Sequence, residues 1–286
     1  MKTLKDQTYV LITGASAGIG RALAFEFARH GKNLLLVSLP DTGLAETLQS
    51  IQEQHAVDVR GFVCDLTDRG APRSIQAWCE KNQFRVSVLV NNAGFGNLER
   101  LEKTQTEVLE NMMVLNNSSL VLMTQLFIPL LARNRKSHLM NVGSLASFMP
   151  LPGKSVYSAT KSFVYSFSYS LYFELMAQNI RVSCLCPGGT LTERVLESME
   201  KSQMKRQKFC QLPHEVAIEA VRGMYKDKFR IIPGWQNQIL YWLSRTLPRF
   251  AKIAIIKKAF QGTTMRKTTI FRPEPPLLRS FALLNR

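Results

Sequence analysis

The sequence predicts an α/β protein whose core is a doubly wound parallel sheet with helices on both faces. Short, nearly continuous apolar segments alternate with helix-length segments between residues 8 and 185. Strands that are apolar on both sides are typical of parallel sheets covered by helices. The chemically reactive residues recur just after the predicted strands, where ligands bind in such sheets. A C-terminal helical extension follows this core.

The first predicted unit is a strand, a tight glycine turn and a helix. Thr8–Ile12 is a run of β-forming residues, Gly14, Gly18 and Gly20 follow it, and Ile19–Ala28 has apolar residues at helical spacing. The next predicted elements are strand Asn33–Leu39, helix Gly43–His55, strand Asp58–Cys64, helix Arg73–Lys81 and strand Val86–Val90. This alternation is expected to form one half of the sheet.

The second half of the core continues the alternation, and the chain then changes character. The predicted elements are helix Glu107–Leu131, strand Ser137–Val142, helix Val156–Gln178, strand Arg181–Leu185, helix His214–Tyr225, strand Arg230–Pro233, and Gln236–Phe260, which Pro248 divides into two helices. The regular alternation stops after Thr192. We therefore expect a core over residues 1–192, with a substrate lid and a basic helical extension of the same domain over residues 193–286.

The positive charge is concentrated near the C-terminus. Residues 1–200 hold 19 Lys/Arg against 17 Asp/Glu, whereas residues 201–286 hold 18 against 4. Such a region attracts an anionic surface, either lipid or nucleic acid. Nucleic acid is less favoured because no helix-turn-helix or zinc-ligand pattern accompanies the charge. Tyr241, Trp242 and their basic neighbours fit two arrangements: helices lying on an anionic membrane, or a packed amphipathic helix with a solvated basic face.

Composition also bears on location. No apolar run reaches the about 20 residues needed to cross a bilayer, and no secretory leader precedes the glycine turn. The five cysteines lack the spacing of a disulfide framework, so we expect reduced thiols. We therefore expect no metal site and a cytoplasmic protein, peripheral on the inner membrane face where its basic region contacts lipid.

Tyr157 and Lys161 form the predicted chemical centre. They are four residues apart, so on a helix they lie one turn apart on one face. A phenol keeps its proton until pH ~10, but an adjacent positive charge lowers its pKa. Such a tyrosine can exchange a proton with an alcohol or carbonyl oxygen near neutral pH. Many helices carry this pair by chance. The presence of Ser144 and of the glycine turn is what makes a catalytic role for the pair a prediction.

The glycine turn predicts a dinucleotide site. Gly14, Gly18 and Gly20 lie between a strand and a helix, so backbone amides at the helix start can approach a pyrophosphate. The spacing T-G-x3-G-I-G resembles that of the short-chain dehydrogenase/reductase family. The resemblance covers roughly residues 5–192, with these motifs in the family's order: Thr13–Gly20, Asp65-Leu66, Asn91–Gly94, Asn116 in VLNNSS, Ser144, Tyr157 with Lys161, and Pro187-Gly188 with Thr192.

The resemblance implies a Rossmann-type fold, a nicotinamide cofactor and a catalytic group of four residues. Ser144 is expected to donate a hydrogen bond to the substrate oxygen, and Tyr157 to pass the proton to or from that oxygen. Lys161 is expected to lower the tyrosine's pKa and to bind the nicotinamide ribose. Asn116 is expected to support a water that links Lys161 to solvent. By analogy we also expect a homodimer formed through the two long core helices.

The cofactor contacts are implied by the same resemblance. Asp65 is expected at the adenine, Asn91, Ala93 and Gly94 along the cofactor, and Pro187–Thr192 at the carboxamide. The full expected set is Gly14, Ser16, Gly18, Ile19, Gly20, Ser38, Asp65, Leu66, Asn91, Ala93, Gly94, Tyr157, Lys161, Pro187, Gly188, Thr190 and Thr192.

The choice between NADP and NAD depends on the end of the second strand. An acidic residue there would bind the ribose hydroxyl of NAD, and a nearby arginine would accept the phosphate of NADP. The chain has Ser38 and Leu39 at these positions, Asp41 comes two residues too late, and Ala17 replaces the basic residue common in NADP enzymes. Both cofactors stay open, and NADP is favoured because no carboxylate repels a phosphate.

Apolar residues around the expected cleft favour a lipophilic carbonyl or alcohol substrate. They are Phe95, Phe148, Met149, Leu151, Met199, Met204, Phe209 and Leu212. The predicted function is an NAD(P)-dependent oxidoreductase that interconverts a carbonyl and an alcohol. The alternative is a catalytically idle Rossmann-type module that senses cofactor or docks on a membrane, and the complete Ser144, Tyr157 and Lys161 set disfavours it.

Overall fold

The computed structural model describes residues 8–149, 151–193, 195–196, 210–248 and 251. The chain divides into two units after Leu247, and nearly all of the second unit lies outside the described residues. The fold below is that of the first unit. The predicted helix after Pro248 and the pocket residues Met199, Met204 and Phe209 fall outside the described part.

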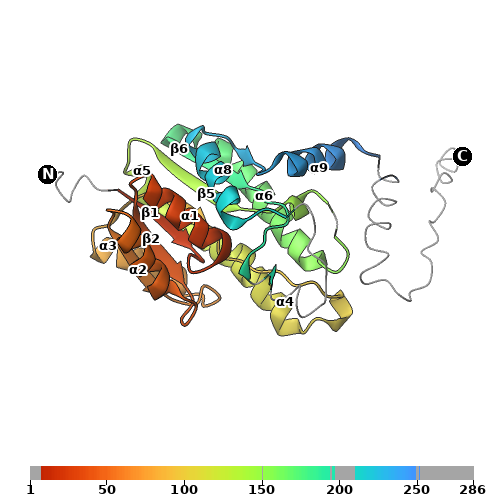
Figure 1. Cartoon of the computed structure of the whole chain (residues 1–286), viewed down its shortest axis with the longest axis horizontal. Coiled ribbons are helices and arrows are strands. Elements are labelled where there is room, and N and C mark those ends of the chain that lie inside the picture. Colours follow the sequence, from red (N-terminus) through yellow and green to blue (C-terminus); the bar gives the residue numbers. More distant parts are fainter. Residues whose placement is uncertain (1–7, 150, 194, 197–209, 249–250, 252–286) are drawn as a thin grey trace, which may run out of the picture. The chain divides into compact units, whose positions relative to one another are not determined.

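A parallel sheet forms the centre of the molecule (Figure 1). In the described residues it has seven strands in the order β3-β2-β1-β4-β5-β6-β7, and every neighbouring pair is parallel. The strands are β1 Thr8–Thr13, β2 Asn33–Ser38, β3 Val59–Val63, β4 Arg85–Asn91, β5 Ser137–Val142, β6 Ile180–Leu185 and β7 Arg230–Ile231. The strand order reverses between β1 and β4, and ligands bind at the carboxyl ends beside such a point. The predicted fold class is confirmed.

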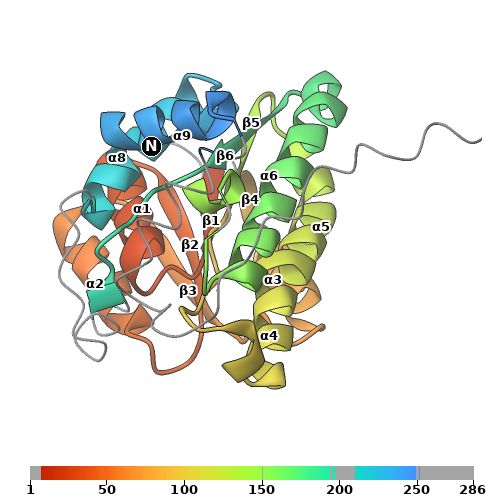
Figure 2. The same ribbon diagram turned by 90° about the vertical axis from the view of Figure 1, so that its right-hand side faces the viewer.

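Helices cover both faces of the sheet, as Figure 2 shows. One face is packed by α1 Gly18–Arg29, α2 Leu44–Gln54 and α8 Pro213–Tyr225. The other is packed by α3 Ala71–Lys81, α5 Leu120–Ala132 and α6 Ser155–Glu174. The remaining α-helices of the described residues are α4 Thr106–Met113 and α9 Trp235–Thr246. Each predicted element that falls in the described residues is present, with ends shifted by two residues or fewer, apart from the long helices Glu107–Leu131 and Val156–Gln178.

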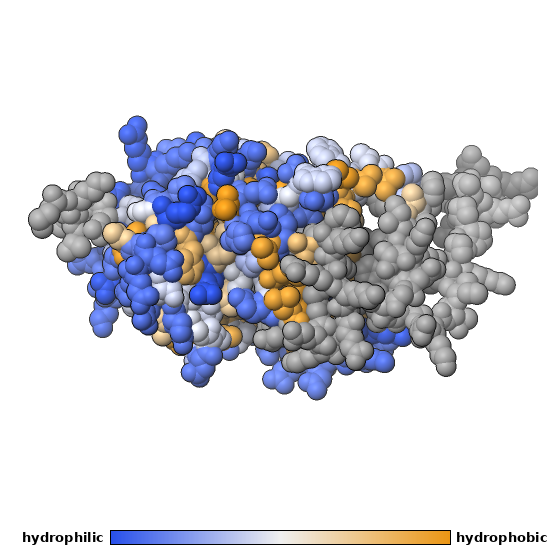
Figure 3. Space-filling model, viewed as in Figure 1, coloured by the Kyte–Doolittle hydropathy of each residue, from blue (hydrophilic) through white to orange (hydrophobic). Residues whose placement is uncertain are grey.

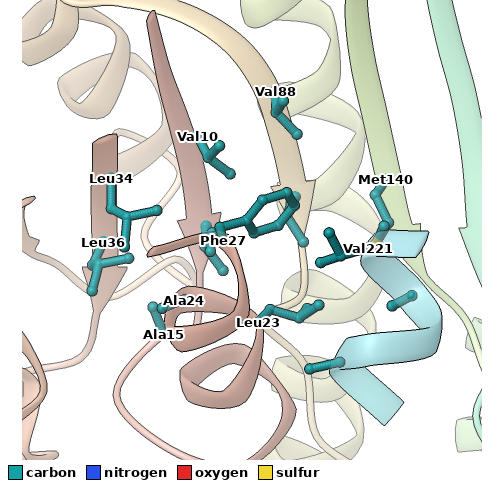
Figure 4. Packing of buried hydrophobic residues seen from close by; sticks show 14 of the residues in the cluster. Val10, Ala15, Leu23, Ala24, Phe27, Leu34, Leu36, Val88, Met140 and Val221 are labelled. Atoms are coloured by element: carbon teal, nitrogen blue, oxygen red, sulfur yellow. The ribbon is translucent and has the colours of Figure 1, made fainter. Parts of the chain in front are cut away.

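Phe27 shows how the core positions the glycine turn. Its fully buried ring lies between the sheet and α8, among Val10, Val88 and Val221 (Figure 4). Burying such a side chain contributes about 2–3 kcal/mol. Phe27 lies near the C-terminal end of α1, so this packing fixes the axis of the helix against the sheet, and with it the direction in which α1 leaves the glycine turn.

The predicted helix Glu107–Leu131 contains an irregularity. It is one helical path whose middle, Val114–Ser119, is π-helical between α4 and α5. Apolar periodicity cannot reveal one extra residue in a turn, and such bulges often mark functional sites. Within the described residues, Thr106–Ala132 has the length and mean hydropathy of a membrane span. Its Phe127 and Leu131 are fully buried in the core beside the sheet.

The exposed face of α9 is apolar. The helix buries the polar side chains Asn237 and Ser244 together with Tyr241. Its exposed large apolar side chains are Trp235 (67%), Ile239, Leu240, Trp242 (60%) and Leu243. Orange apolar atoms lie in Figure 3 where Figure 1 places α9. Arg245 is also exposed on α9, and the other basic residues of the predicted helix pair lie outside the described residues, so both arrangements stay open.

Candidate active site

The fold brings Ser144 and Tyr157 together. Ser144 follows β5 in an extended conformation, and its Oγ accepts a hydrogen bond from the backbone N–H of Ala146 at 3.1 Å. Tyr157 lies in the first turn of α6. The Ser144 hydroxyl lies close enough to the Tyr157 hydroxyl to lower its pKa. A substrate oxygen placed at this pair would meet two hydroxyl groups beyond the carboxyl end of the sheet.

Burial controls the protonation of Tyr157. Removal from water raises the pKa of Tyr157, and the nearby Ser144 hydroxyl acts in the opposite direction. The Lys161 Nζ lies 5.9 Å and the Lys154 Nζ 5.6 Å from the centre of the phenol ring. The neutral phenol is therefore favoured, which is the form that can donate a proton. Lowering of the pKa of Tyr157 by Lys161 stays a prediction.

Lys161 is a buried amine. Its side chain is 6% exposed, and Nζ donates a hydrogen bond to the Val142 carbonyl oxygen at 2.8 Å. Burial lowers the pKa of Lys161 to about 8, while the Cys184 and Cys186 thiols act to raise it. A lysine with such a pKa can release and regain a proton near neutral pH.

Asn116 lies in the π-helical stretch, and its side chain is hydrogen-bonded to the segment after β4 and to α6. Its Oδ1 accepts a hydrogen bond from Phe95 N at 3.0 Å, and its Nδ2 donates to Phe95 O at 2.9 Å and Thr160 Oγ1 at 3.0 Å. A Cβ on Gly94 would lie 2.8 Å from the Asn116 Oδ1 and 3.4 Å from the Lys161 Nζ. Asn116 therefore holds the segment after β4 against α6. Its expected support of a water stays a prediction.

The glycine turn has the shape that a diphosphate requires. Gly14 (φ +64°) and Gly18 (φ +55°) adopt left-handed conformations that favour glycine. A Cβ on Gly20 would collide with the Gly14 carbonyl oxygen, so α1 approaches the turn closely. The side chain of Asn92 donates hydrogen bonds to Thr13 O at 2.9 Å and Gly14 O at 3.0 Å. The residues present therefore fit a dinucleotide cofactor.

The end of β2 carries hydroxyls and no carboxylate. Ser38 is buried, and its Oγ shares hydrogen bonds with Ser16 Oγ at 2.6 Å and Thr42 Oγ1 at 2.9 Å. The predicted adenine residue Asp65 is exposed after β3, where its Oδ1 accepts from Thr67 N at 2.8 Å. These positions leave no acidic side chain to bind the ribose hydroxyls at the end of β2.

Several predicted cofactor residues have side chains in the protein interior. The Asn91 Nδ2 donates to Thr124 Oγ1 at 3.0 Å and Asn141 Oδ1 at 2.9 Å, so its side chain faces the core. Leu66 is buried among core residues, and Ile19 packs against the core on the α1 side. Asn91 and Leu66 can therefore meet a cofactor only through their backbone, whereas Ile19 is only partly buried.

The predicted carboxamide segment lies next to the predicted catalytic residue Ser144. The carbonyl oxygen of Pro187 accepts a hydrogen bond from Leu145 N at 2.9 Å, which joins this segment to the turn after Ser144. Thr190 is buried, and its hydroxyl donates to the Gly188 carbonyl at 3.3 Å. Thr192 lies above the glycine turn, because a Cβ on Gly18 would lie 2.9 Å from its Cγ2. The structure thus brings both ends of the expected cofactor site together.

Three positioning residues are absent from the predicted set. Thr13 Oγ1 accepts from Asn92 N and Ala93 N, each at 3.0 Å, and so ties β1 to the segment after β4. Asn92 itself supports the glycine turn. Asn237 on α9 is buried against Gly188 and donates to Gln211 Oε1 at 2.9 Å. Thr13 and Asn92 lie inside recognised motifs, whereas no sequence spacing points to Asn237.

Comparison with protein families gives a direct match. The family model described as short chain dehydrogenase matches residues 8–203. An NADP-dependent 3-hydroxy acid dehydrogenase, YdfG, of Salmonella typhi is 33% identical over 180 residues, which is 63% of this chain and 71% of that protein. The short-chain dehydrogenase/reductase family 16C member 6 of Bos taurus is 32% identical over 272 residues, 93% of this chain and 81% of that protein.

A solved structure shares both sequence and fold. The short-chain dehydrogenase from Sphingobium yanoikuyae in complex with NADPH is 26% identical, with a TM-score of 0.71 over 92% of this chain and 98% of its own. A 7beta-hydroxysteroid dehydrogenase, at 21% identity and a TM-score of 0.77, supports the fold over 87% of this chain and 96% of its own. The chain belongs to the short-chain dehydrogenase/reductase family of oxidoreductases.

Proposed function

We propose that this protein is an NAD(P)-dependent oxidoreductase that interconverts a carbonyl and an alcohol, with Tyr157 as general acid and base. The observation that carries the proposal is the proximity of the Ser144 and Tyr157 hydroxyls beyond the carboxyl ends of the sheet. A glycine turn shaped for a diphosphate begins at the same edge. The first supplies proton transfer and the second a place for a nucleotide.

The bound nicotinamide supplies or accepts the hydride, and the chain's residues supply everything else. Ser144 donates a hydrogen bond to the substrate oxygen and holds it beside Tyr157. Tyr157, kept neutral by burial, donates its proton to that oxygen during reduction and accepts one during oxidation. Lys161, with its lowered pKa, returns a proton to the site. Asn116 keeps the wall of the site in register with α6.

We propose NADP as the favoured nucleotide. The buried hydroxyl group of Ser38 replaces the carboxylate that would bind the ribose of NAD. The names of two relatives refer to NADP and NADPH, which supports the same choice. The test is oxidation of NADPH and NADH by a panel of carbonyl compounds. Faster turnover with NADPH is expected, and exclusive use of NADH would contradict the choice.

The proposed substrate is lipophilic. Leu98, which is exposed, lies beside Gly153, and Glu99 N donates to Gly153 O at 2.9 Å, close in sequence to Tyr157. Met149 and Leu151 are half-buried in the neighbouring loop. Phe148 packs instead against Tyr165 and Tyr241, so it belongs to the core. Within the same panel, apolar ketones are expected to have lower KM values than hydroxylated ones of equal size.

A cytoplasmic location with contact to an anionic membrane is a second proposal, and the apolar face of α9 supports the membrane contact. Trp235 and Trp242 are exposed on that face, and the sequence from residue 201 onward carries 18 Lys/Arg against 4 Asp/Glu. Aromatic side chains with nearby basic charge are typical of membrane-surface segments.

Homodimerisation is proposed as well, and exposed Phe163 and Phe173 on α6 support it.

Sedimentation with vesicles tests the membrane contact. We expect the full chain to sediment with vesicles that contain phosphatidylserine, and the bound fraction to fall as salt screens the charge. Replacing Trp235 and Trp242 by Ser should reduce binding severalfold, because two exposed aromatic anchors are lost. Equal sedimentation with and without vesicles at low salt would remove the membrane proposal.

A further inference from the structure

The side chain of Glu193 contacts the first residue of α1. Its Oε2 accepts a hydrogen bond from the backbone N–H of Gly18 at 3.1 Å. Gly18 is the first residue of α1, and it belongs to the glycine turn. A carboxylate 175 positions further along the chain therefore binds an amide of the predicted diphosphate site.

The residues just before Glu193 are held in place by contacts with the glycine turn and with Gln211. Thr192 lies against Gly18. Leu191 N donates to Gln211 O at 2.9 Å, and Gln211 N donates to Gly189 O at 2.9 Å. These backbone bonds fix the segment just before Glu193, so its position does not depend on an isolated surface contact.

The chemistry of the amide makes this contact consequential. The first backbone N–H groups of a helix have no intrahelical partner, and the positive end of the helix dipole favours an anion there. A nucleotide diphosphate and the Glu193 carboxylate are both anions that need these donors. They cannot both accept from the Gly18 N–H in the geometry observed, and their charges repel each other.

We propose that Glu193 is an affinity-setting residue that competes with the nucleotide diphosphate for the amides at the start of α1. This inference rests on the proposed function, because it requires that a nicotinamide nucleotide binds at the glycine turn. Glu193 acts through the Gly18 amide and not by contact with the reacting atoms. The competition weakens binding of NADP(H) and NAD(H) alike, since both carry the same diphosphate.

The test is nucleotide affinity of Glu193→Gln, measured by calorimetry or by NADPH fluorescence on the full chain. Removing the charge is expected to lower the Kd for NADPH and for NADH by about three- to tenfold, given the strength of anions at helix starts. The difference in Kd between the parent and Glu193→Gln should decrease at high salt, because salt screens the repulsion between the Glu193 carboxylate and the diphosphate. The affinity for 2′-AMP, which has no diphosphate, should stay unchanged.

Glu215→Gln is the matched control. Glu215 also presents an exposed carboxylate to a backbone amide, that of Leu212 at 2.8 Å, at the start of α8. Its substitution should leave all three affinities within about twofold of the parent. Equal or weaker NADPH binding by Glu193→Gln would overturn the inference alone. Absence of NADPH and NADH binding by the parent would overturn it together with the proposed function.

Discussion

Replacing Tyr157 by Phe is expected to lower the rate of carbonyl reduction by about 10²- to 10⁴-fold, the range for loss of a general acid. The substitution removes the hydroxyl that lies beside Ser144 and leaves the ring, which packs against Gly96. Because the ring stays, the Kd for nucleotide should change by less than about twofold. Steady-state kinetics and nucleotide titration measure the two quantities.

Tyr165→Phe is the control for this experiment. Tyr165 lies on the same helix, and its hydroxyl accepts a hydrogen bond from Arg230 Nη1 at 3.3 Å, away from Ser144. We expect it to keep activity within about threefold of the parent, since a part-buried hydrogen bond contributes little to the site. Full activity of Tyr157→Phe would show that another group transfers the proton.

Replacing Lys161 by Met is expected to abolish measurable turnover and to stabilise the fold at pH 7. Burial lowers the pKa of Lys161 from 10.5 to about 8. Keeping its amine charged in the folded protein at pH 7 therefore lowers the free energy of unfolding by about 3 kcal/mol. Loss of the hydrogen bond to the Val142 carbonyl offsets about 1 kcal/mol of the gain. A net stabilisation of about 2 kcal/mol should remain.

The pH dependence of unfolding shows whether the charge on Lys161 causes this stability difference. Between pH 8 and 10.5 the unfolded chain binds more protons at Lys161 than the folded chain does, so the parent gains stability as the pH rises. The Lys161→Met variant lacks this gain of about 3 kcal/mol, so its advantage of about 2 kcal/mol in free energy of unfolding should shrink across that window and reverse near its upper end. Urea unfolding at pH 7, 8, 9 and 10 measures it. A constant difference would contradict the lowered pKa.

The fold could be predicted because each level of the sequence agreed. The apolar runs of β1 and β2 and the helical period of α1 each specify one local structure, and the glycine turn joins the first two elements. The π-helical stretch could not be predicted, because its extra residue leaves the apolar pattern of Glu107–Leu131 nearly unchanged. What it positions is visible only in three dimensions, in the bonds that Asn116 makes to Phe95 and Thr160.

The site could be predicted where function and spacing coincide, and it could not where long-range contacts decide. Tyr157 and Lys161 share a helix, so their neighbourhood follows from their spacing. The side chain of Asn91 turns inward because Thr124 and Asn141 offer it partners from other elements. Glu193 reaches Gly18 across most of the chain, so no local pattern announces the contact.

Transfer of deuterium from C4-deuterated NADPH to a ketone tests the proposed chemistry most directly. If Tyr157, Ser144 and Lys161 surround the nicotinamide as proposed, the full chain will place the label on the carbinol carbon of one alcohol enantiomer. The Tyr157→Phe variant should form that product at least about 100-fold more slowly. Label released to water, or no oxidation of NADPH or NADH by any carbonyl of the panel, would contradict the assignment.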